Sequence, residues 1–210
     1  MKLLHSCVLT CLLNLLTVHA VADEAKVAVW TAGEGDYHSY RIPSVIKAAD
    51  GGLLAFCEAR KNGLGDAGNI DLVMKRSDNQ GATWGPQTVV WDDGANTCGN
   101  PCPVLDESTG TIWLLLTKNL GSDHESDIIH KRAKSTRTVW VMSSTDNGAT
   151  WSEAKDITAS TKDPEWGWYA TGPGVGIQIK AGSYKGRLVI PCDHSYDDPE
   201  GNVRKGPFGY

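Results

Sequence analysis

The sequence predicts an all-β fold organised as a β-propeller, and three observations predict it. Short segments of four to six residues, rich in β-branched and aromatic side chains, alternate with turns that contain glycine. No stretch of residues 23–210 shows the roughly 3.6-residue periodicity of an amphipathic helix. One eight-residue pattern occurs twice, 67 positions apart, and a repeat of this kind in an all-β chain points to propeller blades.

The first 22 residues precede this fold. Lys2 gives a positively charged start, residues 7–18 form an apolar run, and residues 20–22 supply the small-x-small pattern of a cleavage site. The apolar run is too short to span a bilayer, for which about 20 residues are needed. We therefore expect a cleaved signal peptide over residues 1–22, no membrane span, and a secreted or periplasmic protein.

Six apolar segments are the expected strands of residues 23–210. Glycine-containing turns at residues 50–52 and 108–110 each lie between two apolar runs, as expected for hairpin connections. No linker divides the chain, so we expect one incomplete propeller domain over residues 23–210. The expected strands are Leu53–Cys57, Ile70–Met74, Thr88–Trp91, Ile112–Leu116, Val139–Met142 and Arg187–Ile190.

The repeated pattern occupies Ser77–Trp84 and Ser144–Trp151. In each copy we expect a turn in which an Asn or Asp side chain accepts backbone N–H bonds and a glycine adopts positive φ. The Thr-Trp pair should then begin the next strand with its indole buried. The pattern resembles the Asp-box of six-bladed sialidases. The Asp-box also occurs in propellers of unrelated activity. In the first copy Asn79 replaces the acidic residue. Its role is structural.

Two arginines resemble substrate-binding residues of sialidases. Tyr40–Pro43 resembles the motif in which an arginine, here Arg41, is one of three that bind the sialic acid carboxylate. Arg60 ends the segment that begins at Leu53 and matches the second of the three. Arginine suits this task because its planar fork of donors binds a carboxylate bidentately, which lysine does not do. A salt-bridged arginine at a strand end is the alternative for Arg41.

Asp66 lies six residues after Arg60, between glycines. In sialidases an aspartate five or six residues after this arginine is the acid/base catalyst, and a flexible loop suits a group that reaches over a bound sugar. An ordinary turn aspartate is the alternative. Asp71 is a weaker candidate, because it lies within an expected strand and should have a structural hydrogen bond.

Further residues resemble the sialidase pocket. Asn100, in Asn-Pro-Cys-Pro, matches a segment near the N-acetyl group, with a turn asparagine as the alternative. Glu125 aligns loosely with an acidic residue that faces the glycerol tail, although solvent exposure is the favoured expectation. Tyr169 and Tyr196 match pocket-lining segments, and the phenol of Tyr196 is expected to pack on the sugar. His194 is expected to be a polar residue without catalytic duty.

Net charge and cysteine content limit the classes of partner, disulfide and metal site that we expect for this protein. Without Lys2 the net charge is about −6, which argues against nucleic acid or anionic lipid but not against a basic pocket for an anionic substrate. Four cysteines remain after residue 22, too few for a disulfide scaffold. Cys98 and Cys102 are either paired or small buried hydrophobes, the second being favoured. No Cys/His cluster has metal-ligand spacing. The sialidase mechanism that the resemblance implies needs neither a metal nor an organic cofactor.

The resemblance implies an exo-alpha-sialidase that removes terminal sialic acid with retention. Sialidases use a tyrosine nucleophile with a glutamate, and Asp66 would protonate the leaving oxygen and later deprotonate water. Because the chain shows about three blades of an expected six, the third arginine, the tyrosine and its glutamate are expected beyond residue 210. Sialylated glycans are the expected partners, with no obligatory protein partner. A non-catalytic Asp-box propeller that binds glycans or proteins, a trans-sialidase and another glycosidase stay open.

Overall fold

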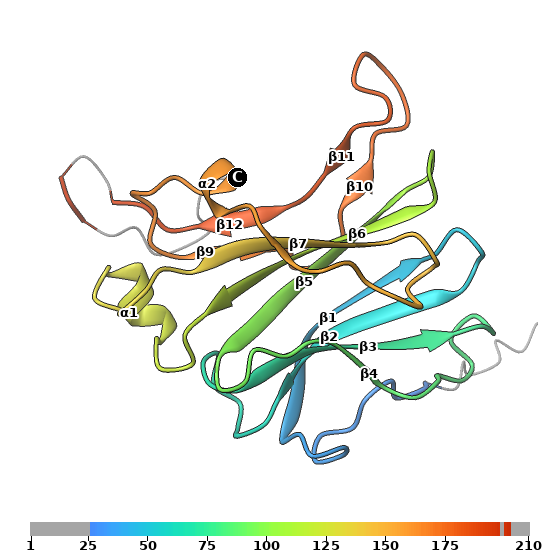
Figure 1. Ribbon diagram of the computed structural model, residues 1–210, viewed down its shortest axis with the longest axis horizontal. Coiled ribbons are helices and arrows are strands. Elements are labelled where there is room, and N and C mark those ends of the chain that lie inside the picture. The colour runs from blue at the N-terminus through green and yellow to red at the C-terminus, as the bar shows by residue number, and fades with distance from the viewer. Residues whose placement is uncertain (1–25, 198–199, 203–210) are drawn as a thin grey trace, which may run out of the picture.

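The structure, a computed structural model, describes residues 26–197 and 200–202 of the 210-residue chain. The expected signal peptide over residues 1–22 lies outside the described residues. Within the described part, twelve short strands and two helices of five and four residues follow one another (Figure 1). The predicted all-β class is confirmed.

Eight strands form two antiparallel meanders of four strands each. A single parallel pair, Ile70 with Thr97, joins them, so the meanders are nearly separate within one hydrogen-bonded sheet. Each meander has the form of a propeller blade. The first blade contains β1 (Ser39–Lys47), β2 (Leu53–Arg60), β3 (Ile70–Ser77) and β4 (Thr88–Trp91). The second contains β5 (Thr97–Asp106), β6 (Thr111–Asn119), β7 (Thr138–Ser144) and β8 (Lys155–Asp156).

Four shorter strands begin a third unit, in which β9 pairs with β12 and β10 pairs with β11. Figure 1 shows the β10–β11 hairpin projecting away from the two blades, with α1 in the connection between β6 and β7. These elements are β9 (Tyr169–Thr171), β10 (Ile177–Gln178), β11 (Leu188–Val189), β12 (Cys192–His194), α1 (Glu125–Ile129) and α2 (Thr158–Thr161).

All six expected strands are present, but the sequence pattern did not predict the other six, β1, β5, β8, β9, β10 and β12. Tyr40–Pro43 lies inside β1 rather than before the first strand, and Asn100–Pro103 lies inside β5 rather than in a turn. Prolines and the irregular register between Arg41 and Ser44 and between Gly99 and Cys102 conceal the alternating pattern. The two helices are too short to give a periodic signal.

The Asp-boxes form the turns that connect β3 to β4 and β7 to β8. In the second copy the carboxylate of Asp146 accepts hydrogen bonds from the Thr150 N–H at 2.9 Å and the Ser144 hydroxyl at 2.8 Å. Asn79 accepts the equivalent bonds in the first copy, at 2.9 and 3.0 Å. One detail of the expectation is wrong: Trp151, like its counterpart in the first copy, lies before the next strand and is half-buried.

The main core lies between the two blades. Side chains alternate across each strand, so one face of the first blade packs on one face of the second. The other face of the first blade packs on the N-terminal segment, where Tyr37 contacts a small cluster. The four described cysteines are free thiols, and Cys98 and Cys102 are buried, as favoured from the sequence. The buried inter-blade cluster contains Leu54, Phe56, Leu72, Met74, Ile112, Leu114, Leu116 and Met142, among others.

Candidate active site

Five of the seven predicted site residues line one cavity of about 290 Å³. These five are Arg41, Arg60, Asp66, Asn100 and Glu125. The cavity's other lining residues are Ile42, Glu58, Arg137, Trp168, Ala170, Pro173 and Asp193. A neighbouring hollow shares Asp66 and Glu125 with the cavity and extends along α1.

The antiparallel order of the blades explains why residues so distant in sequence converge. In an antiparallel meander the first strand starts, and the second strand ends, at the same edge. Arg41 lies near the start of β1, Arg60 ends β2, and Asn100 lies near the start of β5. The Asp-box turns lie at the opposite edge, so they contribute nothing to this cavity.

A left-handed residue before a proline occurs beside the cavity in all three units. Ile42 in β1 has φ 54°, Asn100 in β5 has φ 55°, and Gly172, directly after β9, has φ 81°. Positive φ is uncommon for residues with a Cβ and strained for a β-branched residue such as Ile42. In β1 and β5 the position coincides with the shift in register, where a bulge redirects the chain. The backbone is therefore distorted in both blades at the point that faces the cavity.

The carboxylate of Asp66 lies between the two predicted clamp arginines. Its Oδ1 is 3.0 Å from Nη1 of Arg41 and 2.7 Å from Nη2 of Arg60. Arg41 and Asp66 are 44% and 49% exposed, whereas Arg60 is 2% exposed, so the first two are the accessible members. Two planar guanidinium groups on one carboxylate are the arrangement expected of an anion-binding site.

Arg60 also organises the loop that carries Asp66. Its Nη1 donates to the carbonyl oxygens of Leu64 at 2.6 Å and Gly65 at 3.0 Å. Its Nε donates to Glu58 Oε2 at 3.0 Å. Every nitrogen of this guanidinium therefore has a protein partner in the structure. Arg60 is both a wall of the cavity and the anchor of its loop.

Glu58 connects the two blades and has a role that the sequence did not reveal. Its Oε2 accepts from Arg60 in the same strand, and its Oε1 accepts the backbone N–H of Asn100 in the second blade at 3.0 Å. Gly99 makes this approach available, because a Cβ there would overlap with Oε1. From the third unit, the Thr171 hydroxyl donates to the Asn100 carbonyl at 2.6 Å. Asn100 is thus held from both sides.

Arg137 is the largest omission from the predicted site. It is 2% exposed, lies directly before β7, and stacks its guanidinium 4.1 Å from the ring centre of Trp168. Burial lowers the pKa of Arg137 to about 10, and four carboxylates, led by Glu58, oppose that shift. The sequence did contain a signal for this residue. Arg137 lies seven residues before the second Asp-box, which is the length of one strand, so it lies at the edge of the blade opposite the Asp-box turn.

Two further carboxylates that line the cavity have raised pKa values. Desolvation, with the negative charge of Asp66, raises the pKa of Glu125. Desolvation also raises the pKa of Asp193, whose Oδ1 is buried without a hydrogen-bond partner among the described residues. Glu125 is exposed, as favoured from the sequence, but it lies at the rim of the cavity. Asp193 was not predicted.

The two predicted tyrosines do not line the cavity. Tyr169 is 5% exposed in β9 and stacks on Trp166, with ring centres 6.1 Å apart. Tyr196 is 40% exposed and lines a separate hollow with Trp166 and His194. Asp71 is structural, as expected, because it accepts a hydrogen bond from Tyr37 at 2.6 Å.

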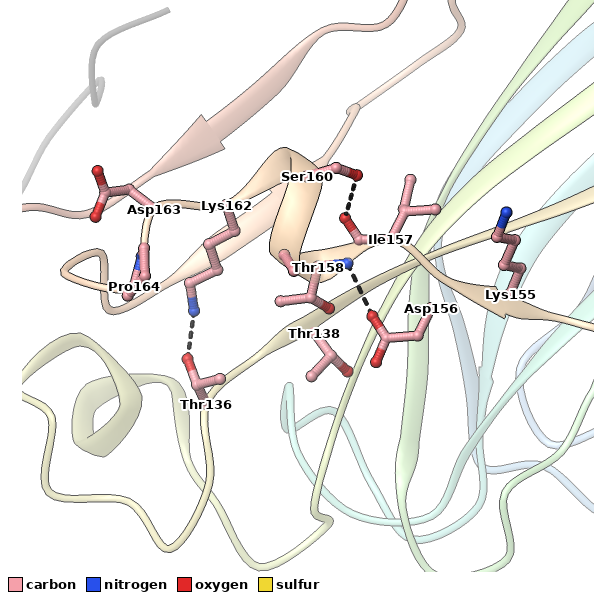
Figure 2. A pocket seen from close by; sticks show the side chains of 11 residues that line it. Thr136, Thr138, Lys155, Asp156, Ile157, Thr158, Ser160, Lys162, Asp163 and Pro164 are labelled. Carbon is pink, nitrogen blue, oxygen red and sulfur yellow. Dashed lines mark hydrogen bonds between the residues drawn. The ribbon is translucent and has the colours of Figure 1, made fainter.

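A larger hollow, of about 590 Å³, contains none of the predicted site residues (Figure 2). It lies between the start of β7, β8 and α2, and Thr138, Ile157 and Thr158 are among its lining residues. Lys162, its buried cation, is already bonded to the protein. No group of three or more His, Cys, Asp or Glu side chains suited to a metal ion occurs in the described part of the chain. The same residues contain no helix long and apolar enough to cross a membrane.

Comparison with known proteins identifies the sequence relatives. Residues 51–204 match the family model described as a BNR repeat-like domain. An exo-alpha-sialidase of Aspergillus fumigatus is 38% identical over 173 residues, which cover 74% of this chain and 41% of that protein. Sialidase-2 of Mus musculus is 31% identical over 183 residues, covering 82% and 47%. The chain thus spans less than half the length of these relatives.

Solved structures agree with the fold. The Hadza microbial sialidase Hz136 superposes with a TM-score of 0.68 at 28% identity, covering 81% of this chain and 35% of that one. A leech intramolecular trans-sialidase superposes with a TM-score of 0.67 at 17% identity, covering 84% and 46%. The second likeness shows the fold alone. The predicted propeller class, with only part of the propeller in this chain, is confirmed.

Proposed function

The chain belongs to the BNR repeat-like domain family and matches the N-terminal portion of sialidases, and from this premise we propose that the full-length protein is an exo-alpha-sialidase. It would hydrolyse terminal sialic acid from glycoconjugates or oligosaccharides. The observation that carries the proposal is the Arg41–Asp66–Arg60 cluster, in which two guanidinium groups meet one carboxylate inside a cavity. A sugar acid has the charge and the planar carboxylate that this cluster suits.

Binding of substrate exchanges one carboxylate for another. In the structure the Asp66 carboxylate lies between Arg41 and Arg60. An acid catalyst has to be protonated and close to the leaving oxygen, so Asp66 leaves the two arginines when a substrate carboxylate replaces it there. The three glycines of the surrounding loop, at positions 63, 65 and 68, give this segment the freedom to move.

In the proposed reaction Asp66 donates a proton to the glycosidic oxygen and later removes one from the attacking water. Asp66 lines both the cavity and the neighbouring hollow, so a leaving group has open space on its outer side. The nucleophile is a tyrosine, activated by a glutamate, outside these 210 residues, and two displacements at one carbon give retention. This scheme uses protein side chains alone, without a cofactor.

The rest of the cavity would hold the neutral parts of the sugar. Asn100 and Glu125 line the cavity and would offer hydrogen-bonding groups to an N-acyl group and to a polyol tail, respectively. Tyr169 is too buried to contact a sugar directly and supports Trp166 instead. Tyr196 remains a proposed contact at the outer hollow, which it lines.

We also propose that residues 1–22 direct export, so that the protein acts on sialylated glycans outside the cytoplasm. Transfer of the sialyl group to a second sugar is the alternative reaction, and a leech intramolecular trans-sialidase shares the fold. A non-catalytic glycan-binding propeller is the other alternative. It has no requirement for Asp66 between two arginines.

The test compares the full-length protein with Asp66→Asn and Arg41→Ala variants on a fluorogenic sialoside and on a natural sialoside. Asp66→Asn should lower kcat/KM by roughly 100-fold or more on the natural substrate and less on the one with a good leaving group. Arg41→Ala should mainly raise KM, since one charge-assisted contact to the substrate is lost.

The control is Glu153→Gln, a carboxyl-to-amide change at an exposed residue just after the second Asp-box, at the opposite edge of the blade. Its kinetics should equal those of the wild type. Wild-type turnover of the natural sialoside by Asp66→Asn would remove Asp66 from its proposed role. Unchanged KM in Arg41→Ala would contradict the carboxylate clamp, and products linked to an added acceptor sugar would identify a transferase.

A further inference from the structure

Arg137 lines the cavity, and three of its five N–H groups donate to side chains of the protein. Its Nε donates to the Thr117 hydroxyl at 3.0 Å, and its two Nη atoms donate to the side-chain oxygens of Asn119 and Asn100. Trp168 covers one face of the guanidinium. Among the described residues no carboxylate lies within ion-pair distance of Arg137, so its direct partners are all uncharged.

These contacts determine which way the Asn100 amide points. Arg137 is a donor only, so the atom of Asn100 that faces it must be the oxygen. The Thr117 hydroxyl accepts from Arg137 and therefore directs its own hydrogen to the same Asn100 Oδ1, 3.1 Å away. The Asn100 Nδ2 group then points away from this network, and it has no acceptor among the described residues. Two N–H donors are left for the cavity that Asn100 lines.

Arg137 is itself held firmly. Lys162 donates to the Arg137 carbonyl at 3.1 Å and to the Gly167 carbonyl at 2.6 Å, and it also binds the Thr136 hydroxyl, as Figure 2 shows. These bonds tie the start of β7 to the segment that leads to Trp168. A buried cation with this many fixed partners has one orientation, and so does the amide that depends on it.

We infer that Arg137 is a positioning residue that sets the specificity of the site through Asn100, an inference that rests on the proposed sialidase function. Because Arg137 and Thr117 bind the amide oxygen of Asn100, only the N–H donors of this amide are free to bind the substrate. The site therefore selects a sugar that places an uncharged acceptor oxygen, such as an acyl carbonyl, against Asn100. Arg137 does not bind the substrate carboxylate.

A double-mutant cycle in the full-length protein separates these roles. If Arg137 acts through Asn100, then Asn100→Ala, Arg137→Met and the double variant should each lower kcat/KM by roughly 10-fold, mostly through KM. A direct substrate contact by Arg137 predicts multiplied losses, roughly 100-fold in the double variant. Losses that multiply would overturn the inference.

Asn100→Asp is a second and more specific test of the Asn100 donors, because aspartate keeps the shape and the oxygen of asparagine but has no N–H. Beside Arg137 the new carboxylate is paired, so the melting temperature should stay near that of the wild type while KM rises roughly 10-fold. When Arg137→Met is added, the half-buried carboxylate loses its cationic partner and the melting temperature should fall. An unchanged KM in Asn100→Asp would show that the substrate does not use the donors.

The two proposals fail differently. A wild-type protein without turnover of any sialoside would remove the sialidase function. The melting arm needs no turnover and still tests the Arg137–Asn100 geometry: equal melting temperatures for Asn100→Asp with and without Arg137 would contradict it. If Arg137→Met does not fold, the KM and melting temperature of Asn100→Asp alone decide the inference.

Discussion

Glu58 is the residue through which the first two blades share one site. Its two oxygens serve different blades, Oε2 toward Arg60 and Oε1 toward the backbone N–H of Asn100. Loss of Arg60 would leave the buried Glu58 carboxylate an unpaired charge, and loss of the Asn100 N–H bond would leave its Oε1 without that hydrogen bond. The space for this bridge depends on the absence of a side chain at Gly99.

We therefore predict that Gly99→Ala lowers the free energy of unfolding by about 1–3 kcal/mol, since the new methyl group overlaps with Glu58. It should also reduce kcat/KM, because Glu58 orients both Arg60 and Asn100. Denaturant unfolding and steady-state kinetics measure the two effects. The matched control is Gly63→Ala, where a Cβ meets nothing within 4 Å and φ is not positive. Equal stability of the two variants would contradict the prediction.

Asp193 gives a pH-dependent prediction. Burial raises its pKa above the usual 3.8, so its contribution to stability is fully present below that value and is lost as pH rises through the folded-state pKa. Asp193→Asn should therefore be the more stable protein at pH 7, by on the order of 1 kcal/mol, with the difference shrinking toward pH 4. Thermal melting at pH 4, 5.5 and 7 checks this. A difference that does not vary with pH counts against it, and the exposed Asp36→Asn is the control.

At the scale of elements, the two Asp-boxes form the same turn, one with an amide side chain and the other with a carboxylate. Asp146 binds the Thr150 N–H and the Ser144 hydroxyl, and Asn79 accepts the same two bonds in the first copy. Arg76 in β3 joins both turns, because it pairs with Asp78 at 2.6 Å and donates to the Asn147 carbonyl at 3.1 Å. The turns thus hold the blade edges opposite the cavity.

Asp146→Asn should keep most of the melting temperature, whereas Asp146→Ala should lower it, since only the amide repeats the hydrogen bonds of Asn79. Hydrogen bonds from Thr150 and Ser144 hold the pKa of Asp146 at about 2. The associated stability is present above 3.8 and is lost as pH falls through about 2, and Asp146→Asn lacks this loss. Melting curves from pH 2 to 7 compare the three proteins. Identical curves for the Ala and Asn variants would contradict the structural role.

At the scale of the whole molecule, the cavity lies where three units meet. The first blade contributes Arg41 and Asp66, the second contributes Asn100 and Arg137, and the third contributes Trp168. Their relative positions depend on the packing of the inter-blade core rather than on any single loop. The geometry of the site therefore depends on the close packing of that core.

Leu114→Ala tests this dependence, because Leu114 is fully buried in the inter-blade cluster. The cavity left behind should cost about 2–5 kcal/mol in unfolding free energy. The control Leu64→Ala removes a side chain that is 65% exposed and should change stability by less than about 0.5 kcal/mol. Chemical denaturation of the full-length protein measures both. A loss below that of the control would mean that the blades do not rely on this core.

The sequence by itself determined the local features: the strands with uninterrupted apolar runs, the hairpin turns and both Asp-boxes. It also identified five cavity residues, because Arg41, Arg60 and Asp66 have a spacing that resembles a known motif. It missed β1 and β5 as strands, since prolines and bulges break the two-residue alternation on which strand prediction depends.

Only the tertiary structure decided how Glu58, Arg137 and Asp193 take part. Each is an ordinary charged residue within its own segment, and each becomes a site residue only when strands from different blades meet at one edge. Hydrogen bonds between blades, such as that from the Asn100 N–H to Glu58, depend on the register and packing of separate sheets. Local patterns specify which residues form strands, and the meeting of blades specifies which of their ends share a cavity.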